Sequence, residues 1–316
     1  MLLLRAIVTA FALLTASLAL AGDGSEAEKR IAITFDDTPR HPGAFLTEDE
    51  RATLLIEELR KAGVEQATFF VNPGKTGKRA GAEARIAAYV AAGHVLANHT
   101  STHPRLSQTD TTQYLADLDA AGAWLKGRVG ARPWFRFPYL DEGRSNKEKR
   151  DTVRAALIER GLLNASPTID ASDWWLDNAL NQAERNGIPY DKAAAGQLFV
   201  KTHVEAAEFY HALALEAFGR PIAHNILLHE TDLSAMFIGD LIAGLQAEGW
   251  VIVTSDEAFA DPAYRVQPDV PSAQGTLTEL VAWEEGIASQ RWYPGNDTRL
   301  LEQRFNDQVI GKSGDE

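Results

Sequence analysis

The chain has 316 residues, 45% of them hydrophobic and 9% aromatic, with a formal net charge of −13 and no cysteine. This length accommodates one large domain or two smaller ones, and the absence of cysteine excludes disulfides and a thiol nucleophile. The acidic balance disfavours nucleic acid and anionic membranes as partners, whereas it is compatible with a neutral polymer such as a glycan. The sequence does not indicate the oligomeric state.

The first 21 residues have the features of a cleavable export signal. A short start with one positive charge, Arg5, is followed by the apolar stretch 6–18 and by an A-x-A cleavage site that ends at Ala21. The apolar stretch is short for a bilayer span, and no stop-transfer flank follows it. We therefore expect cleavage after Ala21, a periplasmic or secreted mature protein, and no stable membrane insertion after cleavage.

Strand-like apolar segments alternate with helix-like segments along the rest of the chain. In chain order we expect a strand at 31–35, a helix at 47–62 with a capping box, a strand at 67–71, a helix at 82–92, a strand at 94–97, a helix at 110–126, a strand at 134–137, a helix at 147–160, and strands at 162–166 and 225–228, then a helix at 233–247 and a strand at 250–253. This alternation predicts a parallel sheet of an α/β protein. Seven strands favour a barrel over an open sheet, although the count alone does not decide.

Two regions interrupt the alternation. Residues 176–218 form a long, alanine-rich, helical stretch between the fifth and sixth strands, and residues 261–316 follow the last strand. We interpret the first as an insertion that packs on the barrel or shapes its cleft, and the second as a C-terminal extension. The expected organisation is thus a signal peptide at 1–21, a barrel domain at 22–260 and an extension at 261–316.

Polar side chains follow the ends of five predicted strands. They are Asp36 and Asp37, His99 and His103, Arg136 and Tyr139, Asp173, and His229. In a parallel barrel these carboxyl ends converge on one face, which is where active sites form. The sequence therefore predicts that these side chains, although distant along the chain, share one site.

Three of these residues are suitable ligands for a divalent cation. His99 and His103 are four positions apart, and on a helical turn such a pair lies on one face, within reach of one ion. Asp37 would add a carboxylate, and the resulting set favours zinc or another late divalent metal. The neighbouring Asp36 would stay ionised beside the cation and could accept a proton. Taken alone, the histidines could be surface residues, and the aspartates could cap a helix or bind calcium.

The remaining strand-end residues have supporting roles available to them. Arg136 could hold an aspartate through a bidentate contact, and the backbone N–H of Tyr139, just after Pro138, could donate to a developing oxyanion. Asp173 could set the tautomer and the pKa of a histidine, which would make His229 a general acid. An exposed Trp174 would provide a stacking platform for a sugar ring, and Trp174 and Pro138 are the candidate substrate contacts. Each of these residues, seen alone, is more often structural.

Five segments together resemble the polysaccharide deacetylases of carbohydrate esterase family 4, which contain the NodB-like domain. The segments are Thr-Phe-Asp-Asp at 34–37, His-Thr-Ser-Thr-His at 99–103, Arg-Phe-Pro-Tyr at 136–139, Asp-Ala-Ser-Asp-Trp at 170–174 and Leu-Leu-His at 227–229. The similarity spans about 31–260. Any one segment alone is unspecific, whereas their joint presence in this order is highly specific.

The resemblance implies a distorted (β/α) barrel and the metal-dependent removal of acetyl groups from N-acetylated glycans of the chitin-oligomer or peptidoglycan type. It implies Asp37, His99 and His103 as metal ligands, with Zn²⁺ favoured and Co²⁺, Mn²⁺ or Ni²⁺ as alternatives. It also implies the catalytic set, which comprises Asp36 as base, Arg136 as its tether, Tyr139 as oxyanion donor, and His229 as acid oriented by Asp173.

The sequence departs from the family pattern at two positions beside the expected cleft. Thr38 and Leu140 stand where the family usually has glycine. Three other functions remain open from the residues alone: an O-acetyl esterase on a xylan-like polysaccharide, a non-haem iron oxygenase built on the same two histidines and carboxylate, and a catalytically inactive glycan-binding protein. The second Asp and the Asp173–His229 pair have no evident role in an oxygenase.

Overall fold

The computed structural model describes residues 28–288 and 290–311, so the predicted signal peptide lies outside the described residues. The strands are β1 Lys29–Thr38, β2 Thr68–Val71, β3 Val95–Asn98, β4 Ala131–Phe135, β5 Asp141–Arg144, β6 Leu163–Asn164, β7 Ile169–Asp170, β8 Ala223–His229, β9 Trp250–Ile252 and β10 Ala273–Gln274. The α-helices are α1 Glu48–Lys61, α2 Ala82–Ala91, α3 Thr111–Leu125, α4 Lys147–Glu159, α5 Asp173–Arg185, α6 Lys192–Phe218, α7 Asp232–Ala247, α8 Ser255–Ala260, α9 Leu277–Glu284 and α10 Thr298–Phe305.

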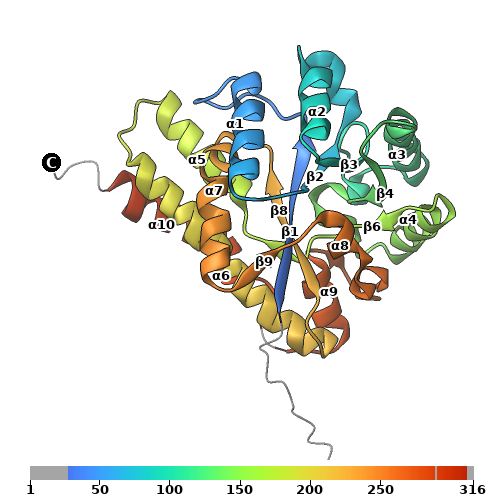
Figure 1. The fold of residues 1–316 in the computed structure, drawn as a ribbon. Coiled ribbons are helices and arrows are strands. Elements are labelled where there is room, and N and C mark those ends of the chain that lie inside the picture. The colour runs from blue at the N-terminus through green and yellow to red at the C-terminus, as the bar shows by residue number, and fades with distance from the viewer. Residues whose placement is uncertain (1–27, 289, 312–316) are drawn as a thin grey trace, which may run out of the picture.

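The parallel sheet has the strand order β6-β4-β3-β2-β1-β8-β7, and an eighth strand, β9, pairs with the start of β1. The two end strands of this path, β6 and β7, do not pair with each other in the described part of the chain. Helices surround the curled sheet, with the long β1 at its centre (Figure 1). The predicted fold class, a distorted (β/α) barrel of about seven parallel strands, is confirmed.

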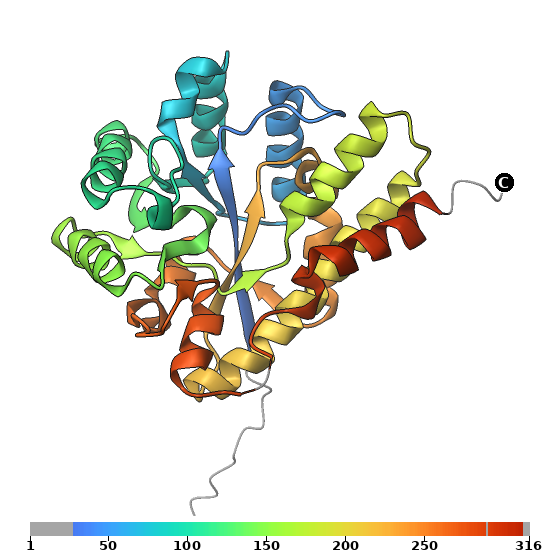
Figure 2. The ribbon, with the colours of Figure 1, turned by 180° about the vertical axis from the view of Figure 1, so that it is seen from behind.

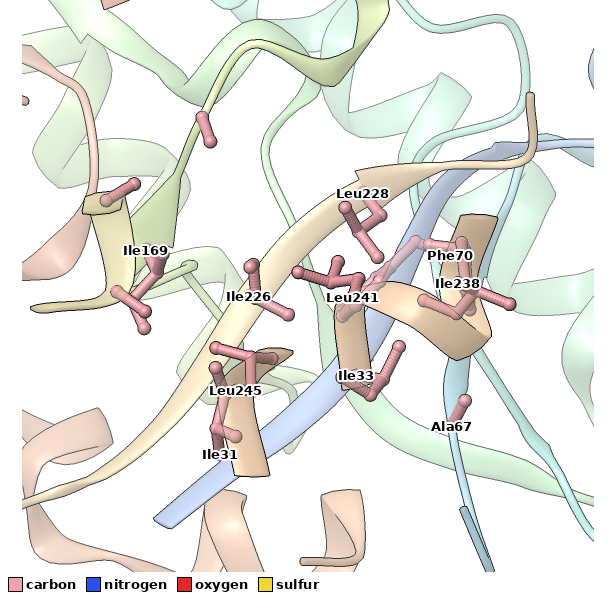
Figure 3. Packing of buried hydrophobic residues seen from close by; sticks show 14 of the residues in the cluster. Ile31, Ile33, Ala67, Phe70, Ile169, Ile226, Leu228, Ile238, Leu241 and Leu245 are labelled. Atoms are coloured by element: carbon pink, nitrogen blue, oxygen red, sulfur yellow. The ribbon is translucent and has the colours of Figure 1, made fainter. Parts of the chain in front are cut away.

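The hydrophobic core lies between the sheet and the helices that cover it. Ile31, Ile33 and Phe35 lie on one face of β1, by the two-residue period of a strand, and all three are fully buried. Figure 3 shows Ile238, Leu241 and Leu245 of α7 packed over β1 and β8. The spacing of these α7 residues places them on one helix face. This packing fixes the strands whose carboxyl ends hold the predicted site residues.

Most expected elements are present, with small shifts at their ends. The capping box predicted from Thr47 and Glu50 starts α1, with both reciprocal hydrogen bonds formed. The sequence missed β7, which has only two residues and pairs with β8. Strand β7 ends at Asp170, so it places the turn that leads to Asp173, the first residue of α5, beside the end of β8.

The described part of the segment after residue 260 packs into the same core as the barrel. Strand β10 pairs antiparallel with β5, and Leu277 and Val281 of α9 are buried in the main hydrophobic cluster. Leu301 and Phe305 of α10 belong to that cluster too, and Figure 2 shows α10 alongside α6. The described residues after 260 therefore share the core of the barrel.

Candidate metal and catalytic site

A cavity of about 480 Å³ opens at the carboxyl ends of the central strands. The predicted site residues that line it are Asp36, Asp37, His99, His103, Tyr139, Trp174 and His229. Arg136 and Asp173 are fully buried behind this lining, in contact with Asp36 and His229. The structure thus brings together nine of the ten predicted residues. Pro138 is buried and does not line the cavity, so the structure gives it no contact surface for a substrate.

Asp37, His99 and His103 could hold one metal ion, because one ligand atom from each lies within 4.8 Å of the others. The Nε2 atom of His103 is 3.0 Å from Oδ1 of Asp37. The Nδ1 atom of His99 is 2.8 Å from the carbonyl oxygen of Arg136. A carbonyl only accepts, so Nδ1 must donate, and Nε2 of His99 is left with a free lone pair.

The protonation of this triad suits metal binding. Burial lowers the pKa of His99 and of His103 to about 3, so both imidazoles are neutral at neutral pH. Burial would raise the pKa of Asp37, but the contact with His103 and the charges of Lys75 and other neighbours hold it well below its usual range. Two neutral imidazoles and one carboxylate form a donor set that fits zinc or a similar divalent cation.

The two histidines do not lie on a helical turn, contrary to the geometry expected from their spacing. They flank a loop that follows β3, in which Thr100 and His103 have left-handed backbone conformations, with φ of 62° and 67°. The backbone N–H of His103 donates to the Thr100 hydroxyl at 3.1 Å. The side chains therefore converge through a strained turn rather than through helical periodicity.

Left-handed backbone conformations are concentrated at this site. Of the seven non-glycine residues with positive φ in the described chain, six belong to the strand-end segments or adjoin them; these six are Asp37, Thr100, His103, Tyr139, Leu140 and Ser172. Such conformations are costly for non-glycine residues and cluster at functional sites. Leu140 has φ of 51°, which explains why glycine would suit this position.

Asp36 is held by Arg136. A guanidinium nitrogen of Arg136 donates to Oδ1 of Asp36 at 2.7 Å, and the same nitrogen donates to the Thr34 hydroxyl at 2.9 Å. Burial nevertheless raises the pKa of Asp36 above its usual value, with Arg136 opposing the rise. In the protein without a bound cation, burial thus outweighs the charge of Arg136 at Asp36, which is only 3% exposed.

Asp173 and His229 form a tightly held pair. Oδ1 of Asp173 lies 2.7 Å from Nδ1 of His229, and Oδ2 accepts from the His229 backbone N–H at 2.7 Å. Burial would lower the pKa of His229, but the Asp173 charge raises it above its usual value. The same contact lowers the pKa of Asp173 to about 2, against the effect of its burial. Asp173 thus orients the imidazole through Nδ1, which leaves Nε2 available, and His229 lines the cavity.

Exposed aromatic rings stand at the rim. Trp174 is 42% exposed and Tyr139 is 44% exposed, and both line the cavity. The Tyr139 ring packs against His103, with ring centroids 4.4 Å apart. The guanidinium carbon of Arg105 lies 3.5 Å from the centroid of the same Tyr139 ring. Such rings offer stacking surfaces for a sugar.

Several residues that line the cavity had no predicted role, namely Arg40, Arg105, Leu140, Asp170, Ser172, Leu227, Gln274 and Gly275. Asp170, Ser172 and Leu227 belong to quoted segments but had no assigned role. Gln274 and Gly275 belong to the C-terminal extension. They reach the cleft because β10 pairs with β5. No local pattern in the sequence marks such a long-range pairing.

Glu230 and Asp232 lie at the start of α7, but neither side chain caps it. Thr231 is the N-cap, and its side chain accepts from the backbone N–H of Ser234. The carboxylate of Glu230 instead accepts from the Tyr89 hydroxyl at 2.8 Å, and that of Asp232 accepts from the backbone of Phe45 at 3.0 Å. Both acids are buried, so they tie the loop after β1 and helix α2 to the start of α7.

Comparisons with known proteins agree with this arrangement. Residues 23–159 match the family model for polysaccharide deacetylase. A peptidoglycan-N-acetylglucosamine deacetylase from Bacillus cereus is 28% identical over 174 residues, which are 54% of this chain and 56% of the relative. The chain thus spans about half the length of this curated relative.

Solved structures with a similar fold include a polysaccharide deacetylase from Bacillus cereus, with a TM-score of 0.50 and 20% identity, covering 72% of this chain and 92% of that chain. A family 4 carbohydrate esterase from Streptomyces lividans, in complex with acetate, has a TM-score of 0.47 and 22% identity, covering 77% of this chain and all of the other. The first supports the fold. The similarity to polysaccharide deacetylases that the five strand-end segments predicted is thus confirmed by the family-model match over residues 23–159 and by the curated relative.

Proposed function

We propose that this protein is a metal-dependent hydrolase that removes acetyl groups from N-acetylated glycans of the chitin-oligomer or peptidoglycan type and releases acetate. The observation that supports it best is the placement of the Asp37, His99 and His103 donor atoms within 4.8 Å of one another, in a cavity that Asp36 and His229 also line. The similarity of residues 23–159 to polysaccharide deacetylases supports the same reaction class.

The three ligands would hold a divalent cation, with zinc favoured by two imidazoles and one carboxylate, and with cobalt, manganese or nickel as alternatives. A cation bound there would act as a Lewis acid on the acetyl carbonyl and would make an attacking water more acidic. The chain's own residues supply the proton transfers and the orientation.

Asp36 is the proposed base, which accepts a proton from the attacking water while Arg136 holds its other oxygen. The backbone N–H of Tyr139 is the proposed donor to the oxyanion. His229, kept protonated and oriented by Asp173, donates a proton to the departing nitrogen. The C–N bond breaks, and acetate and a free amine are the products.

The decisive experiment replaces the proposed base. Asp36→Asn keeps the size of the side chain and removes its basicity, so we expect acetate release from chitin oligomers or peptidoglycan to fall by about 100-fold or more. Bound metal, measured by elemental analysis, should stay near that of the unaltered protein. Full activity in this variant would refute the proposal, and running acetylxylan in parallel would identify an O-acetyl esterase.

We also propose that the protein acts outside the cytoplasm, in the periplasm or after secretion. The signal-like sequence at 1–21 supports this location. Among the described residues, none of the helices is both long and apolar enough to cross a bilayer. N-terminal sequencing of the protein recovered from its host should begin at Gly22, whereas a start at Met1 would contradict the proposed cleavage.

A further inference from the structure

Arg105 is a charged side chain at the cavity that the proposed chemistry leaves unused. It follows the second metal-ligand histidine by two positions and lines the cavity. Its guanidinium carbon lies 3.5 Å from the centroid of the Tyr139 ring, whose other neighbour is His103. Arg105 and His103 thus both contact the Tyr139 ring, and Arg105 makes its contact through a stacked guanidinium.

The charge of Arg105 is not balanced by a protein carboxylate. Among residues 28–288 and 290–311, none of the ion pairs involves Arg105. The other arginine of the cavity, Arg40, donates to Oδ2 of Asp37 at 2.9 Å, so its charge is already paired with a carboxylate. A guanidinium stacked on an aromatic ring keeps its N–H donors available. These donors point outward in the plane of the guanidinium and suit an oxoanion.

The carboxylates of the cavity have partners of their own. Asp36 is paired with Arg136, and Asp37 is contacted by Arg40, Lys75 and His103. Asp170 accepts from the backbone N–H of Ser172, and burial raises its pKa to about 6. Although the whole chain is acidic, the outer part of this cleft thus presents an uncompensated positive charge at Arg105.

Resting on the proposed function, we propose that Arg105 binds a carboxylate carried by the sugar next to the acetylated one, so that the preferred substrate is an anionic glycan. The reacting acetyl group is neutral and would leave the charge of Arg105 unbalanced, so we assign its partner to the neighbouring sugar. One guanidinium matches a singly charged carboxylate, whereas a doubly charged phosphate would also face the nearby aspartates. This differs from the neutral polymer that the overall composition suggested.

A merely structural role for Arg105 gives a different expectation. In that role the stacked guanidinium would do no more than support Tyr139. This residue has a left-handed backbone with φ of 60°, and its N–H is the proposed oxyanion donor. Loss of that support would slow the reaction with every substrate equally. Loss of an anion contact would slow it only with charged substrates.

The test uses matched pairs of oligosaccharides that differ only in charge. One pair joins N-acetylglucosamine to a sugar with a lactyl-ether carboxylate, or to the same sugar with a carboxamide; the other pair uses a uronate and its carboxamide. We expect the unaltered enzyme to prefer the acids about tenfold in kcat/KM, in one pair or both. Arg105→Gln should abolish the preference by lowering kcat/KM on the acids more than on the amides, and Arg105→Lys should keep part of the preference.

Arg128 provides a matched control, because its guanidinium carbon also lies 3.5 Å from an aromatic centroid, that of Trp124, away from the cavity. Arg128→Gln should retain the full preference for the acids, and added salt should weaken this preference in the unaltered enzyme. Equal rates on acid and amide, or an equal loss on both in Arg105→Gln, would overturn the proposal.

Failure of the proposed function can be recognised separately. If no acetate is released from any of the four compounds, the hydrolase proposal fails. Their dissociation constants, measured by calorimetry, then still test Arg105, since acids should bind about tenfold more tightly than amides only when Arg105 is present. Equal affinities would reject the anion contact.

Discussion

At the scale of single residues, one carboxylate sets both the position and the charge of the proposed acid. Asp173 uses its two oxygens on two different groups of His229, the ring Nδ1 and the backbone N–H. A buried carboxylate with two such donors stays ionised, and its charge favours the protonated imidazole. The proton that His229 would deliver is therefore stabilised by Asp173 rather than by solvent.

This arrangement predicts a change in the pH dependence of Asp173→Asn. His229 must be protonated to act as an acid, so activity is lost as the pH rises through its pKa. Since the Asp173 charge raises that pKa, its removal should move the alkaline limb of kcat/KM to lower pH. We expect up to about a 100-fold loss of kcat/KM near pH 8. A pH–rate profile checks this, with metal content as the control; an unmoved alkaline limb would contradict the role of His229.

The chemistry of the residues made much of the site predictable. Asp37, His99 and His103 are recognisable because few residue types bind metals, and each follows a strand-like segment. The left-handed turns that aim them were not predictable, since Thr100 and His103 have no composition that signals positive φ. Arg105 was missed because an unpaired charge becomes evident only when its neighbours are known.

At the scale of elements, the loop after β7 is held by a residue from the far end of the chain. The side-chain oxygen of Asn296 accepts from the Ser172 hydroxyl at 3.0 Å, and its amide donates to the carbonyl of Asp170 at 3.0 Å. Ser172, with φ of 52°, directly precedes Asp173. Asn296 therefore stabilises the turn from which α5 starts and on which the Asp173 carboxylate stands.

We expect Asn296→Ala to impair catalysis without affecting the metal ligands. Two hydrogen bonds to this turn are lost, each contributing about 1 kcal/mol, so kcat should fall by up to about tenfold. Metal affinity should not change, because Asn296 contacts none of the three ligands. Steady-state kinetics and a metal titration measure both effects, and the exposed Asn186→Ala is the matched control. A kcat equal to that of the control would show that the turn holds without Asn296.

Element prediction succeeded where a local signal exists. The start of α1 was predictable because Thr47 and Glu50 satisfy each other's backbone groups, whatever the rest of the fold does. Strand β7 was not, because two residues carry no period. The pairing of β10 with β5 joins segments more than a hundred residues apart, and the sequences of these short strands do not indicate which strand each one pairs with.

At the scale of the whole molecule, a buried acid joins the C-terminal extension to the long helix α6. Glu279 of α9 accepts a hydrogen bond from the Tyr210 hydroxyl, and its other oxygen accepts from the backbone N–H of Thr276 at 2.9 Å. Burial raises the pKa of Glu279 to about 7. Ionisation of this single group is thus coupled to the packing of the extension on the barrel.

The sign of the resulting pH dependence follows from this pKa. A carboxyl that titrates at about 7 in the folded protein, and at 4.5 when unfolded, binds its proton more tightly in the folded state. Its contribution to stability is therefore complete below pH 4.5 and is lost as the pH rises through about 7. Between these limits the free energy of unfolding should fall by on the order of 2–3 kcal/mol.

Glu279→Gln removes this titration and should make the unfolding free energy less dependent on pH. Glutamine has a single acceptor oxygen, so one of the two hydrogen bonds is weakened and the variant can be less stable at pH 5. The diagnostic quantity is therefore the loss of unfolding free energy between pH 5 and pH 8, measured for each protein by urea unfolding. A constant offset cancels in this loss, and the contributions of the other titrating groups cancel when the two proteins are compared. A smaller loss of stability in Glu279→Gln supports the buried neutral acid. Equal losses in the two proteins would mean that Glu279 is already ionised in the fold, and that the extension is held against α6 by a charged carboxylate.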